Sequence, residues 1–478
     1  MNVKLIVLSL ILLLLHACVN DTAENKSDTQ TKKIITNDVT TKLPELPANL
    51  KVRTPMPPKW TYNATIYEVN IRQYTPKGSF KAFETHLPRL KEMGVGILWL
   101  MPIHPIGNKK RKGSMGSYYA VKDYKKVAPE FGSIEDLKSL VNKAHSMGMY
   151  VIIDWIANHS AWDNLLIEEH PDWYTLNNKG EHISPVPDWS DVADFNYDNK
   201  NLQAYMIDAM KFWVNTTNID GFRCDMAGMV PVAFWNKARK ELDKIKPVFM
   251  LAEAEEPELH YSAFDMTYAL ELHHLMNGVA KDEKNALDIN GYFNREELRH
   301  FTADYRMQFI TNHDENALSS TTKERMGDAE DMFTVFTFVV PGMPLVYSGQ
   351  EADLNKKLKF FDKDQIDWKN YPKQPFYTQL IKLKKDHRVL WNGAYGGDMK
   401  RISTTNERNV FAFSRSNQQD SLIMVFNLSD RKEKFLLNDN SYKGSYQNLM
   451  DNEMVKLSNK KHVFLKPWQY YVLKGIEN

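Results

Sequence analysis

Apolar positions follow two alternating patterns from about residue 60 to residue 390. Some runs are almost continuously apolar, as buried strands are, and between them apolar residues return every three or four positions, as on one face of a helix. The clearest helical run covers 80–93, and Ser133 is placed to cap another. Eight runs predict strands, and they cover 64–71, 96–101, 149–154, 219–225, 247–253, 263–270, 307–312 and 343–347.

Eight strands that alternate with helices favour a parallel (β/α)8 TIM barrel of the α/β class. An open, doubly wound sheet is the alternative, but no glycine-rich nucleotide-binding loop follows the first predicted strand. Residues 158–200 interrupt the alternation with a polar stretch that is too long for an ordinary barrel loop. We therefore expect a barrel at 59–157 and 201–390, with a small insert domain after strand three.

The last part of the chain, residues 391–478, lacks the helical pattern. Short β-rich runs at 410–413, 421–426 and 470–473 are separated by turns rich in Asn, Asp and Gly. Closely spaced strands without helices are typical of antiparallel sheets. This part predicts a C-terminal antiparallel β-sandwich.

The N-terminus looks like an export signal. Residues 1–17 combine Lys4 with an apolar run that is too short to span a bilayer as a mature helix. The run ends in Leu-His-Ala-Cys, which resembles the cleavage box of bacterial lipoproteins and implies a lipidated Cys18. An ordinary signal peptide with an incidental cysteine is the alternative. The polar, proline-containing residues 18–58 predict a disordered tether. We expect an exported protein that is lipid-anchored to a bacterial membrane, at the cell surface or in the periplasm.

The composition of the chain mainly excludes classes of partner and of covalent cross-link. With 61 basic and 60 acidic residues, the chain offers no electrostatic case for a nucleic-acid partner. Cys18 and Cys224 are the two cysteines, so lipidation of the first leaves no intrachain disulfide. Stability must come from a core, and the sequence sets no oligomeric state.

Three predicted strands end at or near a carboxylate: Asp225, Glu253 and Asp314. The carboxyl ends of barrel strands meet at one mouth, where such folds keep their chemistry. Arg223 lies on the same face of its strand as Asp225, and a neighbouring arginine lowers the pKa of a carboxyl group, which suits a nucleophile. Glu253 lies between two alanines and suits a proton donor. Taken singly, each residue could also form a structural ion pair.

Two histidines near strand ends, His159 and His313, allow a different interpretation. Histidines and carboxylates in a barrel mouth form the metal sites of some amide hydrolases. However, no two histidines share a strand at ligand spacing, and no lysine stands at a strand end to bridge two carboxylates. We therefore expect no metal here and hydrogen bonds from the histidines to hydroxyl groups.

Four ordered segments resemble the signature regions of the α-amylase family of glycoside hydrolases. They are Asp154–His159, Gly221–Asp225, Ala252–Ala254 and Phe309–Asp314, and supporting matches lie at Trp99–Ile103, Ala193–Asn196 and Gly342–Glu351. The resemblance runs from about Trp60 to the C-terminus. It implies that Asp225 is the nucleophile, that Glu253 is the general acid and then base, and that Asp314 distorts the sugar and stabilises the oxocarbenium-like state.

The resemblance also implies a sugar-binding set. Arg223, His159 and His313 would bind the sugar at the cleavage subsite, and Tyr119, four residues before Asp123, would stack on it. The anomeric configuration would be retained, with nucleophile and acid about 5–5.5 Å apart.

The chain departs from the family pattern at three positions. Gly228 and Met229 stand where starch-cleaving members often have Lys-His, and Ser117 stands where many have a histidine. The missing histidine often helps to ligate a structural calcium ion through its carbonyl oxygen, and Asn158 alone matches another calcium position. We expect no cofactor for the chemistry, and a structural calcium ion is possible but doubtful.

The sequence predicts a retaining glycoside hydrolase that acts on α-1,4-glucans such as starch or maltooligosaccharides. A transglycosylase, or a relative that cleaves cyclodextrins or α-1,6 linkages, is the alternative within the enzyme class. A non-catalytic glucan-binding surface protein is a third interpretation. The three carboxylates disfavour it, because a binding protein needs no acid/base pair.

Overall fold

The computed structural model describes residues 56–300 and 303–476. The predicted leader at 1–17, Cys18 and the tether up to residue 55 lie outside the described residues. In the described part, every helix is too short or too polar to cross a bilayer. The domain boundaries assigned from the sequence stay predictions.

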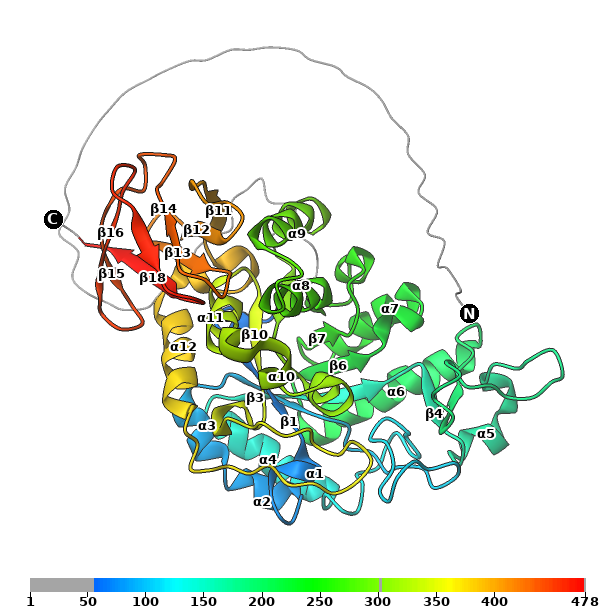
Figure 1. The fold of residues 1–478 in the computed structure, drawn as a ribbon. Helices are drawn as coiled ribbons and strands as arrows, with labels where there is room; N and C mark the ends of the chain where they lie inside the picture. Colours follow the sequence, from blue (N-terminus) through cyan, green and yellow to red (C-terminus); the bar gives the residue numbers. More distant parts are fainter. Residues whose placement is uncertain (1–55, 301–302, 477–478) are drawn as a thin grey trace, which may run out of the picture. The chain divides into compact units, whose positions relative to one another are not determined.

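Eight parallel strands close into a barrel (Figure 1). The closure is visible in the register, because Ile66 of the first strand lies opposite both Ile97 of the second and Leu345 of the last. The predicted TIM barrel is therefore confirmed, and the open sheet is wrong. The barrel strands are β1 (Ile66–Val69), β2 (Ile97–Leu100), β3 (Tyr150–Ile156), β6 (Gly221–Asp225), β7 (Phe249–Ala252), β8 (Met266–Tyr268), β9 (Tyr305–Gln308) and β10 (Met343–Tyr347).

Helices follow most of these strands along the chain. They are α1 (Ile71–Tyr74), α2 (Phe80–Glu84), α3 (Leu87–Met93), α4 (Ile134–Ser146), α6 (Lys200–Thr217), α7 (Val232–Asp243), α8 (Leu270–Ala280), α9 (Ala286–Arg299), α10 (Thr322–Met326), α11 (Glu330–Val339) and α12 (Gln374–Asp386). Ser133 caps α4 in a capping box with Asp136, as the sequence indicates. The single helix predicted over 80–93 is wrong. It divides into α2 and α3, because Pro88 lacks an N–H and lies in the first turn of α3.

Two apolar layers hold the barrel. Alternate side chains of the strands fill its interior, among them Ile66, Trp99 and Leu251. The neighbouring positions, such as Tyr67 and Leu98, pack outward against the helices. Both faces of each strand are therefore buried, which explains the nearly continuous apolar runs in the sequence.

The insert forms a small antiparallel pair. Strand β4 (His159–Ala161) pairs with β5 (Val192–Asp194), and α5 (Leu166–Glu169) lies between them in sequence. The Ala161 N–H donates to the carbonyl of Val121 at 2.9 Å, which ties the insert to the long loop after β2. This bond places His159 next to the carboxyl end of β3.

The C-terminal part contains two antiparallel sheets. Six strands lie in the order β11 (Asp398–Ile402), β12 (Val410–Ser416), β13 (Ser421–Asn427), β18 (Tyr470–Gly475), β15 (Gly444–Asn448) and β16 (Met454–Leu457), and β14 (Glu433–Phe435) pairs with β17 (Val463–Leu465). Ile423 and Val425 face the β14–β17 pair in a shared core, as a sandwich requires.

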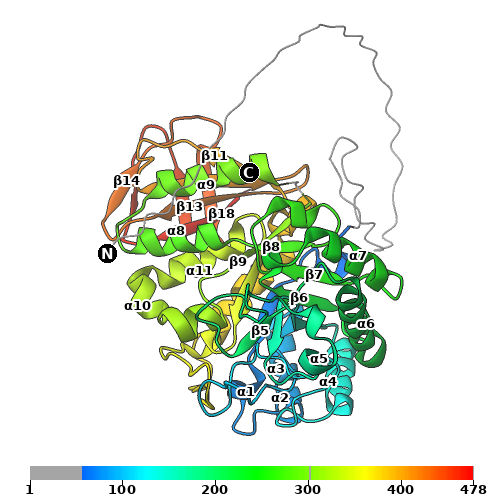
Figure 2. The same cartoon turned by 90° about the vertical axis from the view of Figure 1, so that its right-hand side faces the viewer.

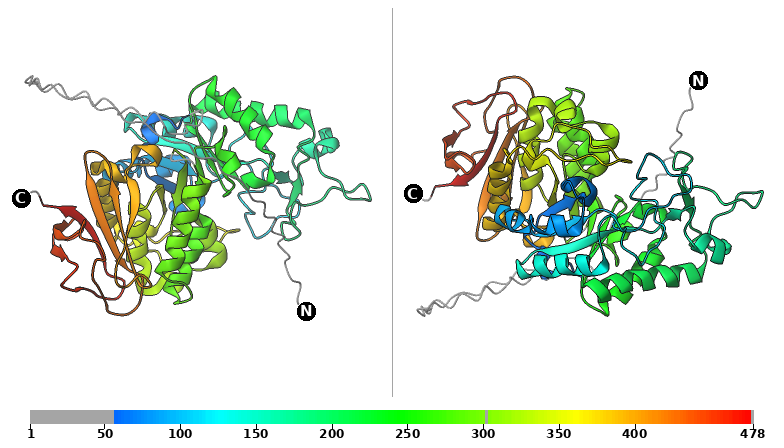
Figure 3. Two further views of the ribbon diagram at one scale, coloured as in Figure 1. Left: turned by 90° about the horizontal axis from the view of Figure 1, so that it is seen from above. Right: turned by 90° about the horizontal axis from the view of Figure 1, so that it is seen from below.

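The opposite face of the six-stranded sheet packs on the barrel helices. Phe336 of α11 lies 5.1 Å from Phe426 and 6.0 Å from Phe411, measured between ring centroids. Phe293 of α9 also lies 6.0 Å from Phe411. Figures 2 and 3 show these helices beside the sheet. The sheet is thus the middle layer between the barrel helices and the small β14–β17 pair.

Candidate active site

The predicted site residues meet at the carboxyl ends of the barrel strands. Asp225 is the last residue of β6, and Glu253 directly follows β7. Asp314 follows β9, and His159 begins β4 just after β3. Tyr119 comes from the loop after β2. Segments that are distant in sequence thus contribute to one cluster, as the parallel topology requires.

Arg223 is the centre of this cluster. Its side chain is fully buried, and its Nη1 lies 2.8 Å from Asp154 Oδ1 and 2.9 Å from Asp225 Oδ1. Its Nη2 lies 2.8 Å from Glu253 Oε2. The Nε–H donates to the hydroxyl of Tyr268 at 3.1 Å. One guanidinium therefore holds both the expected nucleophile and the expected acid.

A strained turn fixes Glu253. Met226, directly after β6, has a φ of 42° and a ψ of 45°, in the left-handed region that few non-glycine residues adopt. In this conformation its backbone N–H donates to Glu253 Oε2 at 2.9 Å. The Glu253 N–H donates to the carbonyl of Cys224 at 3.0 Å. Strain of this kind persists at functional sites where the surrounding structure holds it in place.

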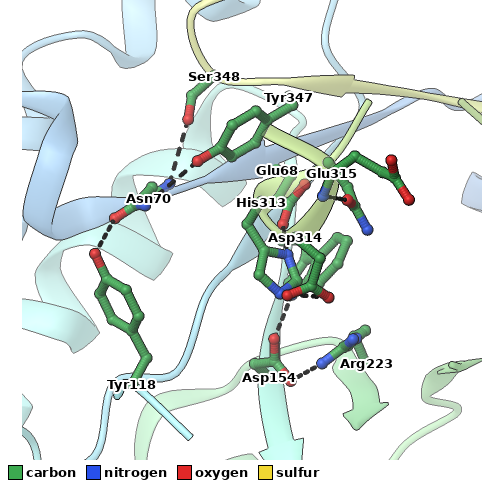
Figure 4. A network of polar contacts seen from close by, with 12 residues as sticks. Glu68, Asn70, Tyr118, Asp154, Arg223, His313, Asp314, Glu315, Tyr347 and Ser348 are labelled. Carbon is green, nitrogen blue, oxygen red and sulfur yellow. Dashed lines mark hydrogen bonds and ion pairs between the residues drawn. The ribbon is translucent and has the colours of Figure 1, made fainter. Parts of the chain in front are cut away.

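A buried chain of polar groups forms the other side of the mouth (Figure 4). His313 Nδ1 lies 2.5 Å from Glu68 Oε1, and its Nε2 lies 2.6 Å from the Tyr119 hydroxyl and 3.2 Å from Asp314 Oδ2. The Tyr119 hydroxyl donates to Asp154 Oδ2 at 3.1 Å. Glu68, His313, Tyr119 and Asp154 make a continuous path that we call the donor-side network.

Glu68 and Asp154 belong to this cluster although the sequence predicts no role for either, and Asp154 opens a signature segment. Both are fully buried carboxylates in otherwise apolar strands. A lone acid in such a strand is the signal that could have found them, because burying a charge requires a partner. Neither partner, His313 nor Arg223, is near them in sequence.

The electrostatics of the cluster correct one expectation. Burial raises the pKa of Asp225 well above its usual range, and Glu253 adds to the rise, while Arg223 opposes it. The expected lowering by Arg223 is therefore outweighed, because the carboxyl group is removed from water and lies beside a like charge. Arg223 also contacts Glu253 as closely as Asp225, so it does not by itself distinguish the nucleophile from the acid.

Burial also raises the pKa of Asp154, against the opposing effect of Arg223, and that of Asp314, against the opposing effect of His313. Close carboxylates in a buried site resist joint ionisation. The raised pKa values therefore favour retention of a proton within the cluster, which acid/base chemistry needs.

The predicted sugar ligands His159 and Tyr119 are largely enclosed. His159 Nε2 lies 3.1 Å from the carbonyl oxygen of Tyr119, and burial lowers the pKa of His159 to about 4, so its ring is neutral. Tyr119 is 9% exposed, and its ring lies nearly parallel to that of Phe360 at 6.1 Å between centroids. Their sugar contacts stay predictions.

On the other side, Gly228 and Met229 belong to a short 3-10 turn after β6, which we call the acceptor-side turn. The side chain of Met229 is 41% exposed. Asn158, which matches a calcium position of the resembled family, directs its Nδ2 to Met229 Sδ at 3.6 Å. Calcium takes hard oxygen ligands, so the Met229 thioether supplies none of the ligands there.

One group of described residues is close enough to hold a metal ion: His260, His300 and Asp304. Asp304 precedes β9 whereas Asp314 follows it, so this group belongs to the opposite end of the strand. His300 also lies 3.7 Å from Glu296 Oε1, and Glu296 is paired with Arg306 at 2.7 Å. Within the described ranges, His159 and His313 belong to no such group.

Comparison with known proteins decides the family. The model of the "Alpha amylase, catalytic domain" matches residues 28–443. The chain belongs to the α-amylase family. It is therefore a glycoside hydrolase, and enzymes of this family need no cofactor for catalysis.

Several relatives of this α-amylase family member carry more specific names. "Alpha-amylase 2" of Dictyoglomus thermophilum is 23% identical over 469 residues, which cover 88% of this chain and 77% of the relative. A cyclomaltodextrinase of Thermoanaerobacter pseudethanolicus is 24% identical over 471 residues, which cover 87% and 78%.

Two solved structures share the fold. A noncanonic maltogenic α-amylase of Thermotoga neapolitana is 29% identical, with a TM-score of 0.80 over 87% of this chain and 99% of that one. An α-amylase of Lactobacillus plantarum is 28% identical, with a TM-score of 0.78 over 87% and 100%. The barrel with its C-terminal sheet is thus shared with amylases nearly over their full length.

Proposed function

We propose that this enzyme hydrolyses α-1,4-glucosidic bonds of starch or maltooligosaccharides with retention of configuration. The observation that carries the proposal is the shared guanidinium of Arg223, which lies 2.9 Å from Asp225 and 2.8 Å from Glu253. Two carboxylates held by one side chain suit a double displacement, in which nucleophile and acid are about 5–5.5 Å apart.

In the first step, an Asp225 oxygen attacks the anomeric carbon while Glu253 gives its proton to the glycosidic oxygen. The carbon–oxygen bond to the leaving sugar breaks, and a covalent β-glycosyl enzyme forms. In the second step, Glu253 takes a proton from water, and the resulting hydroxide displaces Asp225. Arg223 stabilises the carboxylate that Asp225 becomes when it departs.

Asp314, His313 and Tyr119 would hold the sugar during both steps. Asp314 would stabilise the positive charge that develops on the ring, and His313 and Tyr119 would bind its hydroxyl groups. These groups are fixed before substrate arrives, because each is already bonded to a neighbour. Such preorganisation lowers the cost of reorganisation in the transition state.

Two alternative activities follow from the acceptor side and from the relatives' names. Met229 presents a thioether where starch-cleaving members often have a histidine, so fewer hydrogen bonds reach the leaving sugar. Relatives are named maltogenic α-amylase and cyclomaltodextrinase. Cleavage of cyclodextrins, and transfer to a second sugar instead of water, are therefore the alternative activities.

The test is a time course of products from end-labelled maltoheptaose, with amylose, pullulan and cyclodextrin in parallel. We expect maltooligosaccharides first released as α-anomers. Glu253→Gln should abolish turnover while glucan binding stays measurable. Glu258→Gln, an exposed acid five residues further on, is the matched control and should retain full activity. Unchanged turnover in Glu253→Gln would overturn the assigned role.

We also propose that the enzyme is exported and lipid-anchored through Cys18, on the basis of the leader pattern at 1–17. Mass spectrometry of the N-terminal peptide from a bacterial host should find a diacylglyceryl thioether on Cys18. Cys18→Ala should move the activity from the membrane fraction to the soluble fraction. Unmodified Cys18 in the mature protein would contradict the anchor.

A further inference from the structure

Glu68 is a buried acid that the proposed reaction leaves without a task. It lies in β1 between Tyr67 and Val69, and its side chain is fully buried. Its Oε1 is 2.5 Å from Nδ1 of His313, whose side chain is 2% exposed. Because it is covered on all sides, Glu68 cannot touch a sugar and can act only through His313.

We propose that Glu68 is a positioning residue that keeps His313 as a doubly protonated imidazolium, so that the cleavage subsite contains a fixed cation in addition to Arg223. This inference rests on the proposed function, because the cation would serve the sugar at that subsite. It adds a charge state to a residue for which the sequence predicted hydrogen bonds to hydroxyl groups.

With Glu68 and Asp314 ionised, the hydrogen-bond geometry calls for a donor at both ring nitrogens. Nδ1 faces the carboxylate of Glu68, and Nε2 faces the carboxylate of Asp314 at 3.2 Å. Nε2 also lies 2.6 Å from the Tyr119 hydroxyl, which gives its own proton to Asp154. A hydroxyl whose proton is already donated can only accept. A neutral ring would direct a lone pair at an acceptor on one side.

The charges around His313 agree with this assignment. Burial lowers its pKa, but Asp314 and Glu68 outweigh burial, and the pKa of His313 rises to about 9. The titratable and charged groups that face it come from five elements: Glu68 of β1, Tyr119 of the loop after β2, Asp154 of β3, Arg223 of β6 and Asp314 after β9. Since the pKa is raised, the charge is present at neutral pH and is lost as the pH rises through about 9.

The catalytic consequence is an alkaline limit. The Nε2–H and the positive charge orient Asp314 beside the sugar, and both effects weaken when His313 loses a proton. Loss of the His313 proton should therefore contribute to the alkaline limb of kcat/KM. A purely structural Glu68 would affect the melting temperature without moving this limb.

The deciding experiment compares wild type with Glu68→Gln, which keeps the shape and removes the charge. We expect the pKa of the His313 ring, measured by NMR titration of substrate-free enzyme, to fall by at least about one pH unit. The alkaline limb of kcat/KM should move to lower pH with it. Glu68→Asp, which restores the charge, should recover part of the shift.

Glu351→Gln is the matched control. Glu351 is a fully buried acid bonded to the Tyr67 hydroxyl at 2.5 Å and to Arg89 at 2.9 Å, so its removal tests burial without touching His313. Its effect should be confined to stability. Equal pKa values of the His313 ring in Glu68→Gln and wild type would overturn the proposal.

Wild type alone keeps the proposal testable if Glu68→Gln does not fold. A His313 ring that is neutral at pH 7 in the substrate-free wild type would refute the inference even if the enzyme cleaves glucans. A charged ring in an enzyme that cleaves no glucan would refute the proposed function and leave the Glu68–His313 pair intact.

Discussion

The two sides of the barrel mouth are built differently. The donor-side network joins Glu68, His313, Tyr119 and Asp154 through contacts of 2.5–3.1 Å in the interior of the protein. The acceptor-side turn presents Met229, which is 41% exposed and whose side chain contacts Asn158 Nδ2 at 3.6 Å. The side chains of the first side bond to one another, whereas the exposed Met229 side chain of the second has this one long contact. We infer that the chemistry depends on the donor side and that product selection is adjusted on the acceptor side.

The largest effect should come from Asp225→Asn. The amide keeps the shape of the side chain but cannot act as a nucleophile, so kcat should fall by a factor on the order of 10⁴ or more. Stability should respond in the opposite direction. Burial raises the pKa of Asp225, so its ionised form is disfavoured in the folded state, and the neutral amide removes that cost.

Thermal unfolding at pH 7 and single-turnover kinetics check both parts of this prediction. The melting temperature of Asp225→Asn should equal or exceed that of wild type. An inactive variant that also melts much earlier would indicate that the side chain is structural. Such a trade-off between activity and stability is typical of active-site acids.

A smaller effect is expected from Tyr119→Phe, which removes the hydroxyl between His313 and Asp154. Two buried groups lose one partner each, so kcat/KM should fall about tenfold. Tyr118→Phe is the matched control, since that buried hydroxyl donates to Asn70 at 3.1 Å (Figure 4). Steady-state kinetics on one maltooligosaccharide compare them. Equal losses of kcat/KM in both variants would show that the Tyr119 hydroxyl has no special part in the donor-side network.

The smallest effect should come from Met229→His on the acceptor side. An added ring donor near the leaving sugar should change the product pattern from maltoheptaose and alter KM by about two- to fivefold, because an exposed hydrogen bond contributes little. The alkaline limb should stay in place. Met454→His, at an exposed methionine of the C-terminal sheet, controls for the substitution itself. A loss of kcat as large as that in Tyr119→Phe would remove the distinction between the two sides.

Much of the fold follows from the apolar pattern, and the reason is physical. Barrel strands are buried on both faces, so each appears as an apolar run, and the clearest of them, 219–225 and 343–347, contain or match the observed β6 and β10. The least clear run, 263–270, yields only the three-residue β8. The break between α2 and α3 was missed, because the periodicity continues through it and only Pro88 marks it.

The positions of site residues at strand ends were predictable from the sequence. The charge states that depend on burial were not. Asp225, Glu253 and Asp314 could be placed at one mouth, because parallel topology brings strand ends together. The direction of the Asp225 pKa shift could not be predicted, since it is the balance of burial, Glu253 and Arg223. Glu68 was missed because its partner, His313, is 245 residues away.

The most direct test of the account is to trap the glycosyl enzyme. A glycosyl fluoride needs no proton to leave, so Glu253→Gln should still complete the first step and then stall without a base for the second. Peptide mass spectrometry after reaction with α-maltosyl fluoride should find one maltosyl group on Asp225. A sugar attached to another residue, or a β-anomeric product without any adduct, would contradict the proposed double displacement.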